Sequence, residues 1–296
     1  MKLGVIADIH SNKFALQTVL EYLEDKIDAL ICAGDFVGYG PQPQECIKIF
    51  KDFPLPNYLC LGNHDLGVRD SYNRVHSQQN KTDFNILKTF RFRKAAAEML
   101  ELNARKLHQE ESKFLENLQF KLLFQIGQKK IYLTHGTPSV RKSENFGRYL
   151  LPPPLQELEI IKRRIEKVKG AKYSDIIIIG HTHQRFLLQL DNSVSWSLIG
   201  DILEKNPIDF PHTISFKSSR IILNPGSVGQ PRDGSGNSSF AILDLDTNSI
   251  DFHDLAYPKE EFLKLTLKKC VIGVQDESFW ANKFGHFSRS SKMLQK

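Results

Sequence analysis

Pairs of acidic and imidazole side chains stand directly behind apolar segments of this sequence. His181 and His183 follow a run of four isoleucines, residues 176–179. Residues i and i+2 of a β-strand project from the same face, so the two imidazoles can converge on one point. Asp8 and His10 have the same spacing behind the first apolar segment of the chain. Carboxylates and imidazoles that converge in this way are typical ligands of a divalent metal ion.

Three further apolar segments end in residues of the same chemistry, at Asp35, at Gly-Asn-His-Asp (residues 62–65) and at His135. Taken singly, an aspartate or a Gly-Asn pair in such a place is more often a turn residue. Their recurrence at five segment ends favours a shared site instead. The candidate ligands are Asp8, His10, Asp35, Asn63, His135, His181 and His183.

These seven candidate ligands exceed what one ion takes, so the sequence predicts two divalent metal ions. Aspartate, asparagine and histidine suit Mn²⁺, Fe, Zn²⁺, Ni²⁺ or Co²⁺ without any thiolate, and Mn²⁺ is the ion we expect first. A pair of ions roughly 3.5–4 Å apart suits in-line attack at phosphorus, where it generates hydroxide and neutralises the phosphoryl oxygens. One carboxylate must then bridge the two ions.

The elements that would carry these residues alternate regularly over the first part of the chain. Strands are predicted at residues 2–8, 28–34 and 57–65, and helices at 11–24 and 41–53. Strands and helices that alternate with short connections predict parallel βαβ units and an α/β fold. Ligands of such sheets gather outside the carboxyl ends of the strands, which is where the candidate residues stand.

The rest of the chain is predicted as a helical region followed by a mainly β region. Residues 82–118 read as a charged, helical, cap-like insertion, and a strand pair follows at 120–126 and 129–136. A proline-rich loop around residues 152–154, long enough for an active-site lid, leads to a helix at 155–168. Strands are predicted at 175–180, 185–190, 193–199, 220–226, 239–246 and 249–257, the last ones antiparallel, and a helix at 263–269. We expect one domain over residues 1–273, and residues 274–296 as a tail without assigned structure.

Composition sets the class of protein and its compartment. The 296 residues are 41% hydrophobic and 25% charged, as in an ordinary globular protein. A net charge of +6 favours anionic substrates or partners but is too small to indicate nucleic acid by itself. No apolar stretch approaches the roughly 18–20 residues of a membrane span, and no secretory segment is evident. The cysteines lack a CxxC spacing, so we expect a reduced, cytoplasmic protein.

The ordered motifs DIH, GDFVGYG, GNHD, THG, GHTH and NPGSVGQPRDG resemble those of the calcineurin-like metallophosphoesterase superfamily, and within it the small prokaryotic, phosphodiesterase-like branch. The motifs extend from Asp8 to Asp233. The resemblance implies a four-layer αββα sandwich with two mixed β-sheets. It also implies two metal sites that share one bridging aspartate: Asp8, His10, Asp35 and His183 at the first, and Asp35, Asn63, His135 and His181 at the second.

The resemblance further implies a phosphoesterase that attacks its substrate with a metal-bridging hydroxide. His64 is implied as the general acid that protonates the leaving oxygen, a role that suits an imidazole near neutral pH. Asp65 is predicted either to orient His64 or to cap the following helix. Arg232 is a candidate phosphate contact, with a surface salt bridge as the alternative, and Tyr39 is a candidate for stacking on a base.

The motifs also bear on the substrate. Serine/threonine protein phosphatases of the superfamily carry GDxxDRG and GNHE, whereas this chain has no arginine in GDFVGYG and has Asp65 in place of the glutamate. The missing arginine favours phosphodiesters. A phosphomonoesterase, a nucleotide-polyphosphate hydrolase and a nuclease remain alternatives, as does a non-catalytic scaffold like the retromer subunit of this fold. The complete ligand set argues against the scaffold. Residues 196–220 lengthen the chain relative to the smallest family members, so the substrate cannot be inherited from them.

Overall fold

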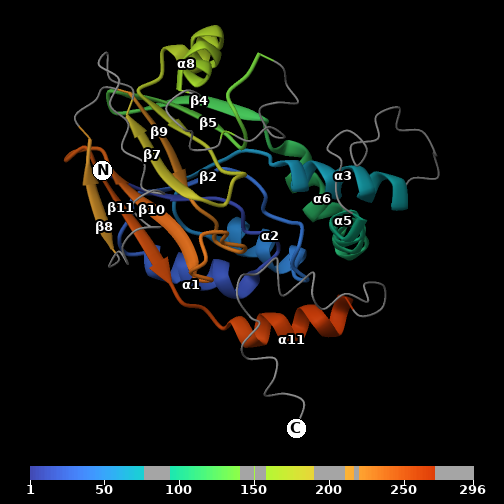
Figure 1. Ribbon diagram of the computed structural model, residues 1–296. Helices are drawn as coiled ribbons and strands as arrows, with labels where there is room; N and C mark the ends of the chain where they lie inside the picture. The colour runs from blue at the N-terminus through green and yellow to red at the C-terminus, as the bar shows by residue number, and fades with distance from the viewer. Residues whose placement is uncertain (77–93, 141–149, 151–157, 190–210, 217–219, 271–296) are drawn as a thin grey trace.

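The computed structural model describes residues 1–76, 94–140, 150, 158–189, 211–216 and 220–270, and shows two β-sheets with helices on their outer sides (Figure 1). The strand predicted at 193–199, the proline-rich loop at 152–154 and the tail after residue 273 lie outside these ranges. Within them, no helix has the length and apolar character that a membrane span requires.

The first sheet has six strands, and its parallel half is the predicted βαβ region. Its order is β3 (Asn57–Leu59), β2 (Ala29–Cys32), β1 (Lys2–Ile6), β10 (Ser238–Asp244), β11 (Ser249–Leu255) and β8 (His212–Ser215). β3, β2 and β1 run parallel, whereas β10 is antiparallel to β1 and to β11, as predicted for the last strands. The edge strand β8 was not predicted, because its short sequence is polar and only half-buried.

The second sheet has five strands in the order β4 (Lys121–Ile126), β5 (Lys129–Thr134), β6 (Ile176–Ile178), β9 (Ile221–Pro225) and β7 (Arg185–Gln189). β6 runs parallel to both of its neighbours, whereas the two outer pairs are antiparallel. The isoleucines of β6 explain why this strand lies at the centre of the sheet. Ile176 and Ile178 pack in the core between the two sheets, while Ile177 and Ile179 pack in the core under α8 (Leu158–Lys167). A central strand that is buried on both faces needs this continuous apolar sequence.

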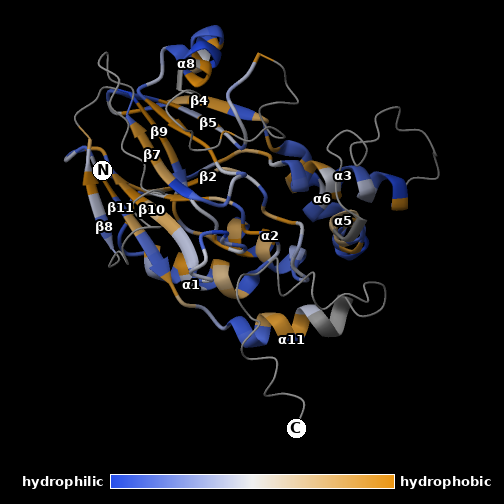
Figure 2. Ribbon diagram, viewed as in Figure 1, coloured by the Kyte–Doolittle hydropathy of each residue, from blue (hydrophilic) through white to orange (hydrophobic). Residues whose placement is uncertain are grey.

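The helices complete four layers. α1 (Lys13–Leu23), α2 (Pro43–Asp52) and α5 (Lys94–Lys106) contribute to one apolar core with the first sheet, and α8 and α9 (Lys169–Lys172) cover the second sheet. In Figure 2 the strands between these helices are mostly apolar. The remaining helices are α3 (Asn63–His76), α6 (Gln109–Asn117) and α11 (Lys259–Cys270). The predicted four-layer α/β sandwich with two mixed sheets is therefore confirmed.

The last predicted helix, 263–269, begins earlier, at Lys259, and the segment after the second helix differs most from the prediction. The third predicted strand ends at Leu59, and Asn63, His64 and Asp65 form the first turn of α3 instead of a strand end. α3 has no clear apolar stripe because its buried face is largely polar, and it was therefore not predicted as a helix. α5 and α6 lie within the region predicted as helical, 82–118. The assignment of that region as a cap stays a prediction.

A buried ion pair joins the two sheets and yields a stability prediction. The guanidinium of Arg185 on β7 is 2.5 Å from Asp233 and 3.4 Å from Asp254, which belongs to β11 of the other sheet. Arg185→Met leaves two largely buried carboxylates without their cation, so the free energy of unfolding should fall by about 3–5 kcal/mol. Urea denaturation measures this change. Arg105→Met, which removes an exposed helix pair with Glu101, is the control and should change the midpoint little. Equal midpoints for both variants would contradict the prediction.

Candidate metal centre

The predicted ligands converge at one edge of the two sheets. Segments that follow β1, β2, β3, β5 and β6 deliver them, and every one of these side chains is at most 7% exposed. Three groups have ligand atoms within 4.8 Å of one another. The groups are Asp8, His10 and His183; His10, Asp35 and His64; and Asp35, His135 and His181. The sequence therefore predicted correctly that these residues come together, whereas their role as metal ligands stays a prediction.

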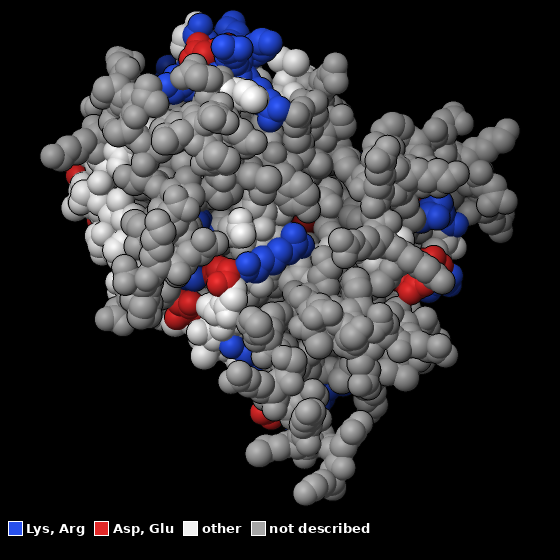
Figure 3. Space-filling model, in the orientation of Figure 1, with Lys and Arg blue, Asp and Glu red and all other residues white. Residues whose placement is uncertain are grey.

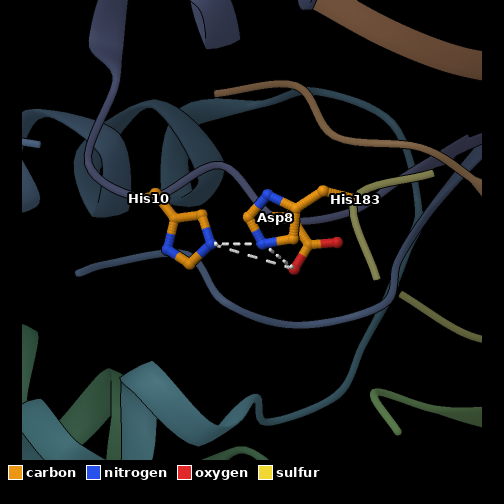
Figure 4. Close-up of side chains that lie close together, drawn as sticks. All are labelled: Asp8, His10 and His183. Atoms are coloured by element: carbon orange, nitrogen blue, oxygen red, sulfur yellow. Dashed lines mark hydrogen bonds and ion pairs between the residues drawn. The ribbon is translucent and has the colours of Figure 1, made fainter. Parts of the chain in front are cut away.

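The first group joins the two sheets (Figure 4). The Nε2 atoms of His10 and His183 are 3.1 Å apart. Oδ1 of Asp8 lies 3.5 Å from Nε2 of His183 and 3.9 Å from Nε2 of His10. One oxygen and two nitrogens thus face a common point, which is the geometry of three ligands on one face of an ion.

Asp35 connects the remaining groups. Its Oδ2 is 3.7 Å from Nε2 of His10 and 3.2 Å from Nε2 of His135. The same His135 nitrogen is 3.1 Å from Oδ1 of Asn63 and 3.1 Å from Nδ1 of His181. The Asp35 carboxylate therefore faces ligands of both predicted sites, as a bridging carboxylate must.

Backbone carbonyls set the orientation of two imidazoles. Nδ1 of His135 donates to the carbonyl of Ala33 at 2.6 Å, and Nδ1 of His183 donates to the carbonyl of Gln230 at 2.5 Å. Each bond fixes its ring so that Nε2 points toward the neighbouring carboxylates, and such orienting contacts are typical of metal-bound histidines. In addition, Nδ1 of His10 is buried without a hydrogen-bond partner among the described residues. The ring nitrogens that lie 3.1 Å apart can share a proton, and a cation that displaces this proton finds two imidazole ligands already facing it. The residues therefore fit a metal centre.

Burial controls the charge of these groups. Burial lowers the pKa of His10, His181 and His183, and the positive charges around them lower it further. These imidazoles are therefore neutral, the state that coordinates metal. Burial also lowers the pKa of His135, but the Asp35 and Asp8 carboxylates outweigh it and raise the value to about 9. A metal ion that binds His135 must displace this proton.

Strained backbone marks the same residues. Asp8, His10, Asp35, His181 and His183 have φ of 55°, 50°, 56°, 69° and 60°. Residues other than glycine rarely adopt this left-handed region, and each such residue costs about 1–3 kcal/mol. Backbone hydrogen bonds hold the conformation, among them those from the N–H groups of Asp8 to Gly34 (3.0 Å) and of His10 to Asp35 (2.9 Å). Strain of this kind clusters at functional sites and could not be read from the sequence.

The other predicted site residues lie close by. The carboxylate of Asp65 accepts hydrogen bonds from the backbone N–H groups of Asp35, Val37 and Gly62 at 2.9–3.0 Å. It thus joins the segment after β2 to the start of α3. That it also orients His64 stays a prediction.

Tyr39 and Arg232 approach the centre from two loops. The Tyr39 ring is only 6% exposed, with its centroid 4.7 Å from that of His10 and 4.4 Å from that of His64. Arg232 is half-buried, bonds Oε1 of Gln230 at 3.2 Å, and its charge lowers the pKa of His183. Their contacts with substrate stay predictions.

Two mixed sheets with buried acidic and imidazole side chains clustered at one edge define an α/β protein with a candidate metal centre. Residues 1–248 match the calcineurin-like phosphoesterase superfamily domain, and the chain belongs to this family. The match confirms the family that the motifs indicate.

The chain is also similar to individual relatives and to solved structures. The chain is 30% identical to the uncharacterized protein MJ0912 of Methanocaldococcus jannaschii over 82% of each chain. A metallophosphoesterase from Sphaerobacter thermophilus superposes with a TM-score of 0.67 at 25% identity, covering 94% of this chain and 96% of that one. A symmetrical bis(5'-nucleosyl)-tetraphosphatase of Psychromonas ingrahamii is 31% identical over 28% of this chain and 31% of its own length.

Proposed function

We propose that the protein is a dinuclear-metal phosphodiesterase with Mn²⁺ as its working ion. The observation that supports this most directly is the position of Asp35, whose carboxylate takes part in two ligand groups at once. Asp8, His10, Asp35 and His183 would hold one ion, and Asp35, Asn63, His135 and His181 the other. When bound, two such ions supply a nucleophile at neutral pH and neutralise the phosphoryl oxygens.

The protein's own groups complete the reaction. Arg232 carries a positive charge close to the imidazoles of the centre and would hold a phosphoryl oxygen. His64 stands at the N-terminus of α3, where its backbone N–H donates to Oδ1 of Asp35 at 2.8 Å. Its imidazole would give a proton to the leaving oxygen. Tyr39 packs against His64 and would restrict its orientation.

A phosphoester panel separates the proposal from its nearest alternative. Metal content of the purified protein is measured first, and rates on bis-p-nitrophenyl phosphate and p-nitrophenyl phosphate follow with Mn²⁺ present. We expect close to two ions per chain and faster hydrolysis of the diester. Faster hydrolysis of the monoester than of the diester would overturn the phosphodiesterase proposal. Metal binding without hydrolysis of either ester would favour a scaffold.

A second candidate, a nucleotide-polyphosphate hydrolase, is favoured by the partial similarity to bis(5'-nucleosyl)-tetraphosphatases. Diadenosine tetraphosphate therefore belongs in the panel, and a kcat/KM for it far above that for the diester would select this alternative. Nucleic acid is a further anionic substrate to test, since lysine and arginine side chains gather over α8 (Figure 3). Activity on single-stranded DNA should fall steeply with salt if such contacts matter.

The proposal includes a compartment and a domain boundary. Cys32, Cys46 and Cys60 are free and buried, which supports a reduced, cytoplasmic setting. The phosphoesterase domain would occupy residues 1–273, with the helices around α5 and α6 as a cap-like insertion.

Metal removal should weaken both stability and activity. Dialysis against EDTA leaves the buried carboxylates and crowded imidazoles without a cation, so the melting temperature should fall and turnover should cease. Mn²⁺ at a hundredfold excess over its Kd should restore about 2.7 kcal/mol of stability. Differential scanning fluorimetry across a Mn²⁺ titration measures this effect independently of turnover. A melting temperature that does not change with the Mn²⁺ concentration would contradict the metal centre. A parallel titration with Ca²⁺ is the control for ionic strength.

A further inference from the structure

A buried asparagine on α5 is joined to the loop that packs against His64. Asn103 is 1% exposed and lies far along the chain from the segments that form the metal centre. Its Oδ1 accepts hydrogen bonds from the backbone N–H of Gly38 (3.1 Å) and from Oγ of Ser11 (2.6 Å). Its Nδ2 donates to the carbonyls of Gly40 (2.9 Å) and Met99 (3.0 Å).

These four bonds use the full capacity of the amide. An asparagine side chain offers two acceptor positions and two donors, and all are occupied here. The partners also fix its orientation, because a flipped amide would place its donors against the Gly38 N–H and its oxygen against two carbonyls. A further hydrogen bond from α5, which Nζ of Lys106 donates to the carbonyl of Pro41 at 2.6 Å, continues the attachment. The helix thus holds the whole Gly38–Pro41 loop.

The Gly38–Pro41 loop is in direct contact with the catalytic region. Gly38 has φ of 139°, and a Cβ there would lie 2.7 Å from Nδ1 of His64 and 2.9 Å from Nδ1 of His10. Its backbone is therefore pressed against both imidazoles. Next to it, the Tyr39 ring packs against the same two side chains. A shift of this loop would change the space in which the His64 ring is held.

We propose that Asn103 is a positioning residue for the general acid: it fixes the Gly38–Pro41 loop and thereby the imidazole of His64. The inference rests on the proposed function, in which His64 protonates the leaving oxygen. It gives α5 a task, since this helix supplies a buried hydrogen-bond anchor for the loop beside the metal centre. Asn103 itself touches none of the proposed metal ligands in the bonds above. The loop also contacts His10, but the backbone N–H of His10 is held separately by the carbonyl of Asp35 at 2.9 Å, so the loss of Asn103 should leave the ions in place.

The first test is the kinetics of Asn103→Ala on diesters with good and poor leaving groups. Misplacement of a catalytic group by about 1 Å can cost up to a hundredfold in rate, so we expect roughly a tenfold loss of kcat or more with phenyl esters. The loss should be smaller with p-nitrophenyl esters, which need less protonation. KM and metal content should stay near the wild-type values. A uniform loss for both leaving groups would overturn the proposal.

A double variant tests whether the effect passes through His64. If Asn103 acts by positioning this imidazole, adding Asn103→Ala to His64→Ala should cost little further rate, because the group that it positions is gone. If the rate losses of the two single variants multiplied in the double variant, the proposal would be overturned. Leu107→Ala is the matched control: Leu107 is buried just after the same helix, so its loss lowers stability without touching the amide network. We expect its kcat to depend on the leaving group as the wild type does.

Two further measurements keep the test decisive. If Asn103→Ala does not fold, Ser11→Ala removes the hydroxyl that donates to Asn103 and accepts from Gly38. A loss of about threefold restricted to poor leaving groups would then support the proposal, and wild-type kinetics would overturn it. If the wild type has no activity, the proposed function fails. The NMR signals of the His64 ring in the Zn²⁺-loaded protein then test, without any turnover, whether Asn103 positions this imidazole. They should shift in Asn103→Ala and not in Leu107→Ala, and unshifted signals in Asn103→Ala would overturn the inference.

Discussion

The Asp35→Asn variant is expected to lose metal from both sites and, with it, about a thousandfold in kcat, which corresponds to about 4 kcal/mol of barrier. Asp35 takes part in two of the ligand groups, and its Oδ2 faces His10 on one side and His135 on the other. An amide keeps the size of the carboxylate but removes the negative charge that two cations share. Elemental analysis of the purified variant and steady-state rates with Mn²⁺ measure the two effects.

The fold should survive this substitution. Oδ1 of Asp35 accepts the backbone N–H of His64 at 2.8 Å, and an asparagine oxygen can accept the same bond. Asp8→Asn is the matched control, because Asp8 belongs to only one ligand group. It should lower the occupancy of one site and leave the other filled. If Asp35→Asn also loses only one ion, or keeps both with full activity, the bridging role of Asp35 is wrong.

The region in which the ligands meet could be predicted from the sequence because apolar runs mark the buried strands. The argument from alternating strand faces was wrong, however, because β1 ends at Ile6 and β6 at Ile178, so both pairs lie in the loops beyond the strands. His181 and His183 accordingly belong to different ligand groups. An apolar run followed by Asp-x-His or His-x-His places polar side chains where a buried strand reaches the sheet edge.

Pairing of β5 with β6 in one sheet and of β1, β2 and β3 in the other aligns these strand ends within each sheet. Contacts such as His10 to His183 and Asp35 to His135 then join the two sheets at the site. The two-sheet arrangement itself came from the resemblance to a family and was not derivable from the alternation of apolar residues.

Other parts of the site depend on contacts that no local pattern reports. The left-handed backbone of Asp8 and His181 is imposed by the surrounding loops, and either residue type is also common in ordinary turns. α3 was missed because its first turn carries polar residues that the site buries. Asn103 shows the same limit: within a charged helix it resembles any polar residue, and only the fold places its amide against Gly38 and Gly40.

His64→Ala should retain both ions and lose roughly 10²–10⁴-fold in kcat for esters with poor leaving groups. The imidazole stands within 4.6 Å of the His10 ring, centroid to centroid, and is only 4% exposed, so it is close enough to the centre to reach a leaving oxygen. Rates should fall less for p-nitrophenyl esters because p-nitrophenolate leaves without help from a proton. A plot of log kcat against leaving-group pKa should therefore be steeper for the variant.

The same measurement separates two roles for this residue. A nitrogen of His64 lies within 4.8 Å of ligand atoms of His10 and Asp35, so the imidazole could be a metal ligand instead of an acid. If His64 is a metal ligand, His64→Ala should lower the metal content and should lower kcat equally for every leaving group. That result would contradict the general-acid role. His76→Ala, at the exposed end of the same helix, controls for any effect of histidine removal on α3. We expect His76→Ala to keep wild-type rates. The leaving-group dependence of His64→Ala then decides its role, because retention of metal alone would also fit a residue that only shapes the pocket.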